Sequence, residues 1–187
     1  MSALFFQSDK RWSSDVLGHG PSTIGRAGCV LVSLTMAADR IGRGLVTPPG
    51  ANDLCRRGDA FRHFRDGEWR RADLLYVPRA ALALGFIAPP DDVTEAVPGH
   101  PALPTALANA LGRGLALVRV DHTGDERGDH TILATSIDTV KGVVHCLDPA
   151  IGPMTLAWPS LSATVMWRDK EKTYRVTKVQ PLRRTEH

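Results

Sequence analysis

The chain has 187 residues, 43% of them hydrophobic, which suits one domain with a sizeable core. Its 23 Lys and Arg against 20 Asp and Glu give a formal charge of +3, a surplus too small to indicate nucleic-acid binding. No apolar run approaches the roughly 18 residues of a membrane span, and the N-terminus carries no basic and apolar signal segment. We therefore expect no nucleic-acid partner, no membrane span, and a chain made without a signal peptide that is cytoplasmic or virion-associated.

The first half of the chain is predicted to be helical. Apolar residues at helical spacing, bounded by Gly and Pro signals, predict four helices. They cover residues 30–41, a short stretch near 51–54, residues 71–84 and residues 103–111. Gly42 and Gly85 stand where the first and the third of these helices are expected to end.

The second half changes to runs of strand-forming residues. Strands are expected over residues 115–120, 131–137, 143–147 and 174–179. Helices first and strands second indicate an α+β fold rather than an alternating parallel sheet. We expect a single domain over residues 1–180 and a solvated C-terminal tail over residues 181–187.

The three cysteines, Cys29, Cys55 and Cys146, are too few for a disulfide framework and odd in number. No Cys-x-x-Cys or His-Glu-x-x-His spacing is present, so we expect no metal and no cofactor. Cys29 differs from the other two because it follows Gly28 at the start of the first predicted helix. Unpaired backbone N–H groups and the helix dipole favour negative charge there, and such sites lower a thiol pKa from about 8.5 to roughly 3.5–7.5. Cys29 is either a nucleophile or an ordinary buried small residue.

A thiolate nucleophile needs a base, and the base needs a third group that orients it. His130 opens one predicted strand and Asp148 ends the next, and antiparallel pairing brings these two ends together. Gln7 precedes the Cys29 helix, where its amide can serve as an oxyanion donor beside the Cys29 backbone N–H. Each of these three residues also has a purely structural interpretation. His130 can be a core histidine, Asp148 can cap the turn before Pro149, and Gln7 can hydrogen-bond polar groups near the chain end.

The loop from Asp121 to Asp129 carries four carboxylates and one histidine. Oxygen ligands of this kind suit a hard cation, but these acids and glycines do not follow EF-hand spacing. The preferred interpretation is a solvated loop beside the active cleft that helps to select the substrate. Trp12, Trp158 and Trp167 are expected to anchor the core.

Several short motifs occur in a suggestive order. The N-terminal part holds Gln7-Ser8-Asp9-Lys10-Arg11-Trp12, then Leu17-Gly18, Ser22-Thr23-Ile24 and Gly28-Cys29. The C-terminal part holds Gly128-Asp129-His130 and Asp148-Pro149-Ala150-Ile151-Gly152. Together they resemble the C39-like cysteine peptidases of the papain-like superfamily, in which a Gln and a Trp precede a Gly-Cys helix and an Asp-Pro-x-x-Gly turn follows the histidine strand.

The resemblance implies a papain-like α+β domain, with an N-terminal helical part packed on a C-terminal antiparallel sheet. It implies Cys29 as nucleophile, His130 as general base and acid, Asp148 as its orienting partner and Gln7 as oxyanion donor. Such a thiol protease, bacterial or phage-encoded, would hydrolyse peptide or isopeptide bonds in a peptide, a protein or peptidoglycan through a thioester. One alternative is a transferase or amidase that uses the same residues. Another is a non-catalytic structural or binding component, such as a phage virion or tail protein in a larger assembly.

Overall fold

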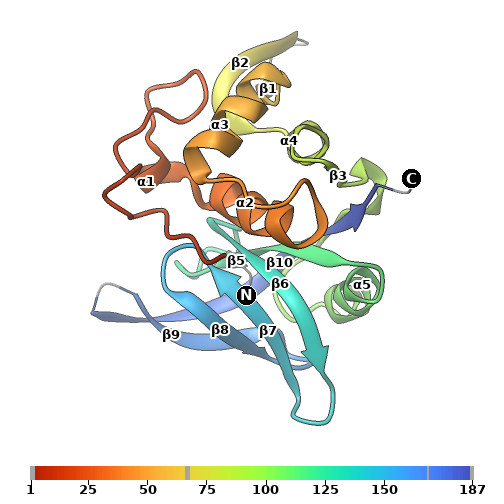
Figure 1. The fold of residues 1–187 in the computed structure, drawn as a ribbon. Coiled ribbons are helices and arrows are strands. Elements are labelled where there is room, and N and C mark those ends of the chain that lie inside the picture. Colours follow the sequence, from red (N-terminus) through yellow and green to blue (C-terminus); the bar gives the residue numbers. More distant parts are fainter. Residues whose placement is uncertain (1–2, 66–67, 168, 186–187) are drawn as a thin grey trace.

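A computed structural model describes residues 3–65, 68–167 and 169–185, with helices gathered in the first half and strands in the second (Figure 1). The part of the chain before residue 115 contains α1 (Ile24–Ala27), α2 (Cys29–Ile41), α3 (Pro48–Arg57), α4 (Val77–Ala83) and α5 (Ala102–Leu111). It also contains the hairpin β1 (Phe61–Arg65) and β2 (Glu68–Leu75), the short strands β3 (Phe86–Ile87) and β4 (Thr94–Glu95), and the 3-10 turn η1 (Pro90–Asp92).

The second half of the chain forms a closed antiparallel barrel. Its strands are β5 (Leu115–Asp121), β6 (His130–Asp138), β7 (Val143–Asp148), β8 (Gly152–Ala157), β9 (Ser162–Trp167) and β10 (Lys170–Arg184). Each strand pairs with the next, and β10 pairs with both β9 and β5, so the ring closes within the described residues. The first part of β10, Lys170–Arg175, pairs with β9, and its later part, Arg175–Leu182, pairs with β5.

The expected papain-like fold, with a helical part packed on an antiparallel sheet, is therefore wrong. The chain is dominated by a closed six-stranded barrel with a few short helices around it (Figure 1). Local patterns identified β5, β6 and β7 but missed β8 and β9, which carry polar residues and Pro153. They also found only the middle of β10, whose 15 residues reach two neighbours. Closure is a long-range property that period-2 alternation along single strands does not reveal.

Two hydrophobic cores explain the near-continuous apolar runs in β5 and β6. Successive side chains of a strand point to opposite faces. Leu115, Leu117 and Leu133 lie in a core shared with the N-terminal helices. Their neighbours, Val118 and Ile132 among them, lie in a second core shared with α5. Both faces of these strands are buried as a result, and α2 packs directly against β6.

The predicted helices are largely confirmed. The helix that starts at Cys29 runs to Ile41, and Gly42 follows it. The short second helix begins earlier than expected, at Pro48, and the fourth covers Ala102–Leu111. None of the helices in the described part of the chain has the length and apolar character that crossing a membrane requires.

The helix predicted over residues 71–84 is wrong in its first half. Residues 68–75 form β2, which pairs with β1 in a hairpin. Only Val77–Ala83 is helical, with Pro78 in the first turn, where proline is tolerated because its missing N–H has no intrahelical partner. The helical spacing was therefore extended too far toward the N-terminus, over residues that pair with β1 instead.

The solvated tail expected over residues 181–187 is also wrong for its first part. Strand β10 continues to Arg184, and Leu182 is fully buried against the helical part. Leu182 pairs with Leu115 of β5, so these residues belong to the sheet. Residues 186–187 of the expected tail lie outside the described residues.

Candidate active site

Cys29 occupies the first turn of α2 and is half-buried. Gly28 precedes it, and a Cβ at Gly28 would lie 2.4 Å from the carbonyl oxygen of Ile24, so only glycine fits this entry to the helix. Ser33, one turn later, donates a hydrogen bond of 3.2 Å to the carbonyl oxygen of Thr131 on β6. That bond and the α2–β6 packing hold the Cys29 end of the helix beside the start of β6, where His130 stands.

His130 and Asp148 meet as the hairpin register predicted. Antiparallel pairing of β6 with β7 brings the start of one beside the end of the other. His130 Nε2 and Asp148 Oδ1 are 3.0 Å apart, and both side chains are buried. The same Oδ1 accepts hydrogen bonds from the backbone N–H of Ala150 at 2.6 Å and of Ile151 at 3.3 Å. Asp148 therefore has two roles, because the same oxygen caps the turn after β7 and orients the His130 ring.

The two ring nitrogens of His130 serve different partners. Nε2 faces Asp148, which leaves Nδ1 as the ring nitrogen that can face Cys29, and the thiol and the ring line the same pocket, where each shifts the pKa of the other. Burial by itself lowers the pKa of His130, but the contacts with Asp148 and Cys29 outweigh it and raise this pKa to about 9.

Cys29 shows the complementary effect. Burial by itself raises the pKa of the thiol, but the His130 ring and the backbone N–H groups of Thr131 and Val30 lower it below the ordinary value of 9.0. The two shifts together favour a thiolate–imidazolium pair over the neutral pair. This is the charge state in which a cysteine is a nucleophile and a histidine is a proton donor.

Gln7 reaches the same site and is buried. Its backbone N–H donates to the carbonyl oxygen of Pro149 at 2.8 Å, which ties it to the turn after Asp148. Its side-chain Nε2 donates to the carbonyl oxygen of Gly25 at 3.2 Å, at the start of α1. Nε2 carries a second hydrogen that Gly25 does not use, and Gln7 Oε1 is buried without a hydrogen-bond partner among the described residues.

A pocket of about 570 Å³ brings these groups together at one end of the barrel. Gln7, Cys29 and His130 line it, and Asp148 lies fully buried behind His130. The ends of β5 and β9 and the starts of β6 and β10 converge there, on the side of the barrel that faces α1 (Figure 1). The remaining lining residues are Arg26, Ala27, His122, Asp129, Trp167, Lys170 and Lys172.

Sequence patterns missed the aromatic wall of this pocket. Trp167, expected as a core anchor, packs partly buried against the second core and also lines this pocket. Its ring centroid is 4.7 Å from that of His130 in an edge-to-face arrangement. It also stacks on His122 at 4.7 Å, and His122 Nδ1 lies 2.5 Å from Asp129 Oδ1. These contacts shield His130 from solvent. No local signal could have placed Trp167 there, because it lies on a strand that was not predicted.

Tyr174 of β10 is a second residue that was not anticipated. It is fully buried beside His130, at a centroid distance of 5.9 Å. Burial and the charge of Asp148 raise the pKa of its hydroxyl. Within the described residues, Tyr174 Oη and Asp148 Oδ2 are both buried without a hydrogen-bond partner. The two atoms would satisfy each other if the hydroxyl donated to the carboxylate.

The acidic loop next to the pocket is held by its own hydrogen bonds. Carboxylate oxygens of Asp121, Asp125 and Asp129 lie within 4.8 Å of one another. Asp121 accepts from the backbone N–H groups of residues 123, 124 and 126, and from Arg175 at 2.8 Å. Burial alone would raise the pKa of Asp121, but these donors lower it. The cluster is explained as a turn built around a buried carboxylate.

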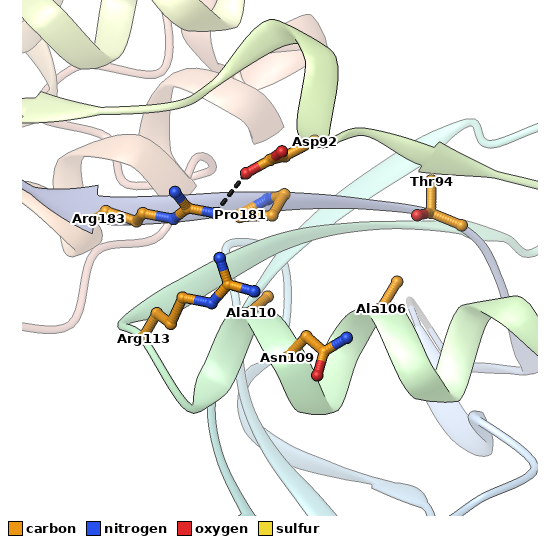
Figure 2. A pocket seen from close by; sticks show the side chains of 8 residues that line it. All are labelled: Asp92, Thr94, Ala106, Asn109, Ala110, Arg113, Pro181 and Arg183. Atoms are coloured by element: carbon orange, nitrogen blue, oxygen red, sulfur yellow. Dashed lines mark hydrogen bonds and ion pairs between the residues drawn. The ribbon is translucent and has the colours of Figure 1, made fainter.

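A separate small pocket of about 170 Å³ lies between α5 and β10 (Figure 2). Arg183 reaches across to Asp92 and forms an ion pair with it, while Arg113 and Asn109 approach from α5 and the residues just after it. No cysteine or histidine lines this pocket. It offers no nucleophile, and the candidate chemistry stays at the Cys29 end of the barrel.

No family model matches this chain, and neither a curated protein nor a solved structure matches it significantly. The resemblance to C39-like cysteine peptidases thus rests on the order of the motifs alone.

Proposed function

We propose that this chain is a cysteine peptidase that hydrolyses peptide or isopeptide bonds through a thioester intermediate. The observation that carries the proposal is that Cys29 and His130 line one pocket, with Asp148 Oδ1 3.0 Å from His130 Nε2. Gln7 in the same pocket adds a donor for the oxyanion. The order of the motifs resembles that of the C39-like peptidases, but the closed barrel is not the papain-like fold that this resemblance implies.

Acylation begins when the Cys29 thiolate attacks the carbonyl carbon of the scissile bond. The carbonyl electron pair moves onto oxygen, where the Cys29 backbone N–H and Gln7 Nε2 stabilise the charge; one such donor typically contributes about 10²–10³ in rate. The intermediate then collapses, and the C–N bond breaks. His130 donates its proton to the leaving amine, and a thioester remains on Cys29.

Deacylation uses the same residues in reverse. Neutral His130 removes a proton from water as that water attacks the thioester carbon. The C–S bond breaks, the carboxylic acid product leaves, and the thiolate–imidazolium pair is restored. Asp148 stabilises the imidazolium in both steps and fixes the ring so that Nδ1 faces the sulfur.

The direct test measures amine release from casein and from purified peptidoglycan by the unmodified protein and by Cys29→Ala. The proposal predicts new amines from at least one substrate with the unmodified protein and none with the variant. Equal release by the two proteins would contradict it. A complete absence of release, together with a Cys29 that alkylates no faster than a free thiol, would favour the non-catalytic binding alternative.

A further inference from the structure

The pocket at Cys29 has a strongly basic rim. Arg26 of α1 and Lys170 and Lys172 of β10 line it together with the nucleophile and its base. Asp129 is the one acidic side chain among its described lining residues, and His122 Nδ1 already contacts that carboxylate at 2.5 Å. The excess of positive charge is local, because the whole chain carries a formal charge of only +3.

Strand register explains why both lysines face the pocket. Lys170 pairs with Trp167, Lys172 with Val165 and Tyr174 with Ala163, so the three β10 side chains lie on one face of the strand. Tyr174 on that face is buried inside the barrel beside His130. The two lysines continue the same row outward, to the open end where Trp167 stands.

Within the part of the chain that the structure describes, neither Arg26 nor the two lysines form an ion pair. Other exposed cations do have carboxylate partners, as Lys141 does with Asp138 at 3.6 Å. Unpaired cations gathered around a pocket attract an anionic ligand, and the attraction weakens with salt.

We infer that the site takes an acidic substrate, one with a carboxylate close to the scissile amide that lies over Arg26, Lys170 and Lys172. This inference rests on the proposed function and adds the chemical class of the substrate. The lysines would bind the carboxylate as flexible point charges, and the Arg26 guanidinium would offer it a planar set of N–H donors. Neutral peptides would lack this contact and would react more slowly.

A matched pair of alkylating reagents tests the inference without knowledge of the natural substrate. Iodoacetate and iodoacetamide react with the same thiolate and differ mainly in the negative charge. Second-order rate constants for Cys29 are measured by peptide mass spectrometry at low salt, for the unmodified protein and for a Lys170→Gln, Lys172→Gln double variant. A control variant, Lys141→Gln with Arg57→Gln, removes the same charge from exposed positions that do not line the pocket.

The expected result is a drop in the iodoacetate-to-iodoacetamide rate ratio of about three- to thirtyfold in the double variant, the range for two partly exposed ion pairs. The iodoacetamide rate stays close to that of the unmodified protein, which shows that the thiolate is intact, and the control keeps the original ratio. High salt lowers the ratio in the unmodified protein. An unchanged ratio in the double variant overturns the inference and leaves the proposed function standing. A Cys29 that reacts with neither reagent contradicts the proposed function, and this inference with it.

Discussion

Asp148→Asn removes the charge that holds His130 protonated and keeps the shape of the side chain. The pKa of His130 rises from 6.5 to about 9 in the folded protein. At about 1.36 kcal/mol per pKa unit, this difference corresponds to about 3 kcal/mol in favour of the imidazolium, shared between Asp148 and Cys29. The amide oxygen of the new side chain can still accept from the turn N–H groups that Asp148 Oδ1 accepts from now.

The assay is an NMR titration of the His130 ring in the unmodified protein, in Asp148→Asn and in Cys29→Ala. We expect a midpoint near 9 in the unmodified protein and a midpoint lower by about one unit or more in Asp148→Asn, because the neutral amide no longer stabilises the imidazolium. The Cys29→Ala variant measures how much of the rise in the His130 pKa is due to Cys29. A midpoint that stays near 9 in Asp148→Asn would refute this electrostatic reasoning.

The same shift sets the pH dependence of stability. A histidine whose pKa is raised on folding stabilises the native state fully below its unfolded pKa of 6.5, and this stabilisation is lost as the pH rises through about 9. The difference in unfolding free energy between the unmodified protein and Asp148→Asn should therefore be largest below pH 6.5 and shrink toward pH 9. Urea unfolding at several pH values measures this difference in unfolding free energy. A difference that grows as the pH rises would contradict the raised pKa of His130.

Three further substitutions test the surroundings of the site. Gly28→Ala places a Cβ 2.4 Å from a backbone oxygen of α1, so we expect the nucleophile to shift and kcat/KM to fall about 10- to 100-fold, with the fold retained by circular dichroism. Tyr174→Phe removes the hydroxyl that faces Asp148, and one lost hydrogen bond of about 1 kcal/mol should lower kcat about fivefold; an unchanged kcat would show that the hydroxyl positions nothing. Asp121→Ala deletes a buried carboxylate with five donors and should cost about 3 kcal/mol in urea unfolding, whereas a loss under 1 kcal/mol would count against that network.

The candidate catalytic residues were accessible from the sequence because each has a recognisable local position. Cys29 follows a glycine at the start of an apolar helix, and that helix forms as predicted. His130 and Asp148 stand at the two ends of adjacent strands, so a single hairpin brings them together. Gln7 was proposed from its place ahead of the Cys29 helix and from the resemblance, and the structure places it in the same pocket.

The remaining features depend on contacts between distant parts of the chain. Closure of the barrel needs β10 to pair with both β5 and β9, and no local pattern encodes a second partner. Trp167, Lys170 and Lys172 enter the pocket only because that closure places the end of β9 and the start of β10 beside His130. A sequence pattern gives the alternation within β10, but not the neighbour that its inward face meets.

The most direct test of the site is the pH dependence of alkylation at all three cysteines, followed by mass spectrometry of the native protein. Burial raises the pKa of Cys55 to about 12 and also raises that of Cys146, so both serve as internal controls. We predict that iodoacetamide modifies Cys29 with an apparent pKa well below the value of about 8.5 for an ordinary thiol, while the other two stay unmodified. An apparent pKa for Cys29 at or above about 8.5, or modification no faster than that of the two buried thiols, would contradict a thiolate–imidazolium pair in this protein.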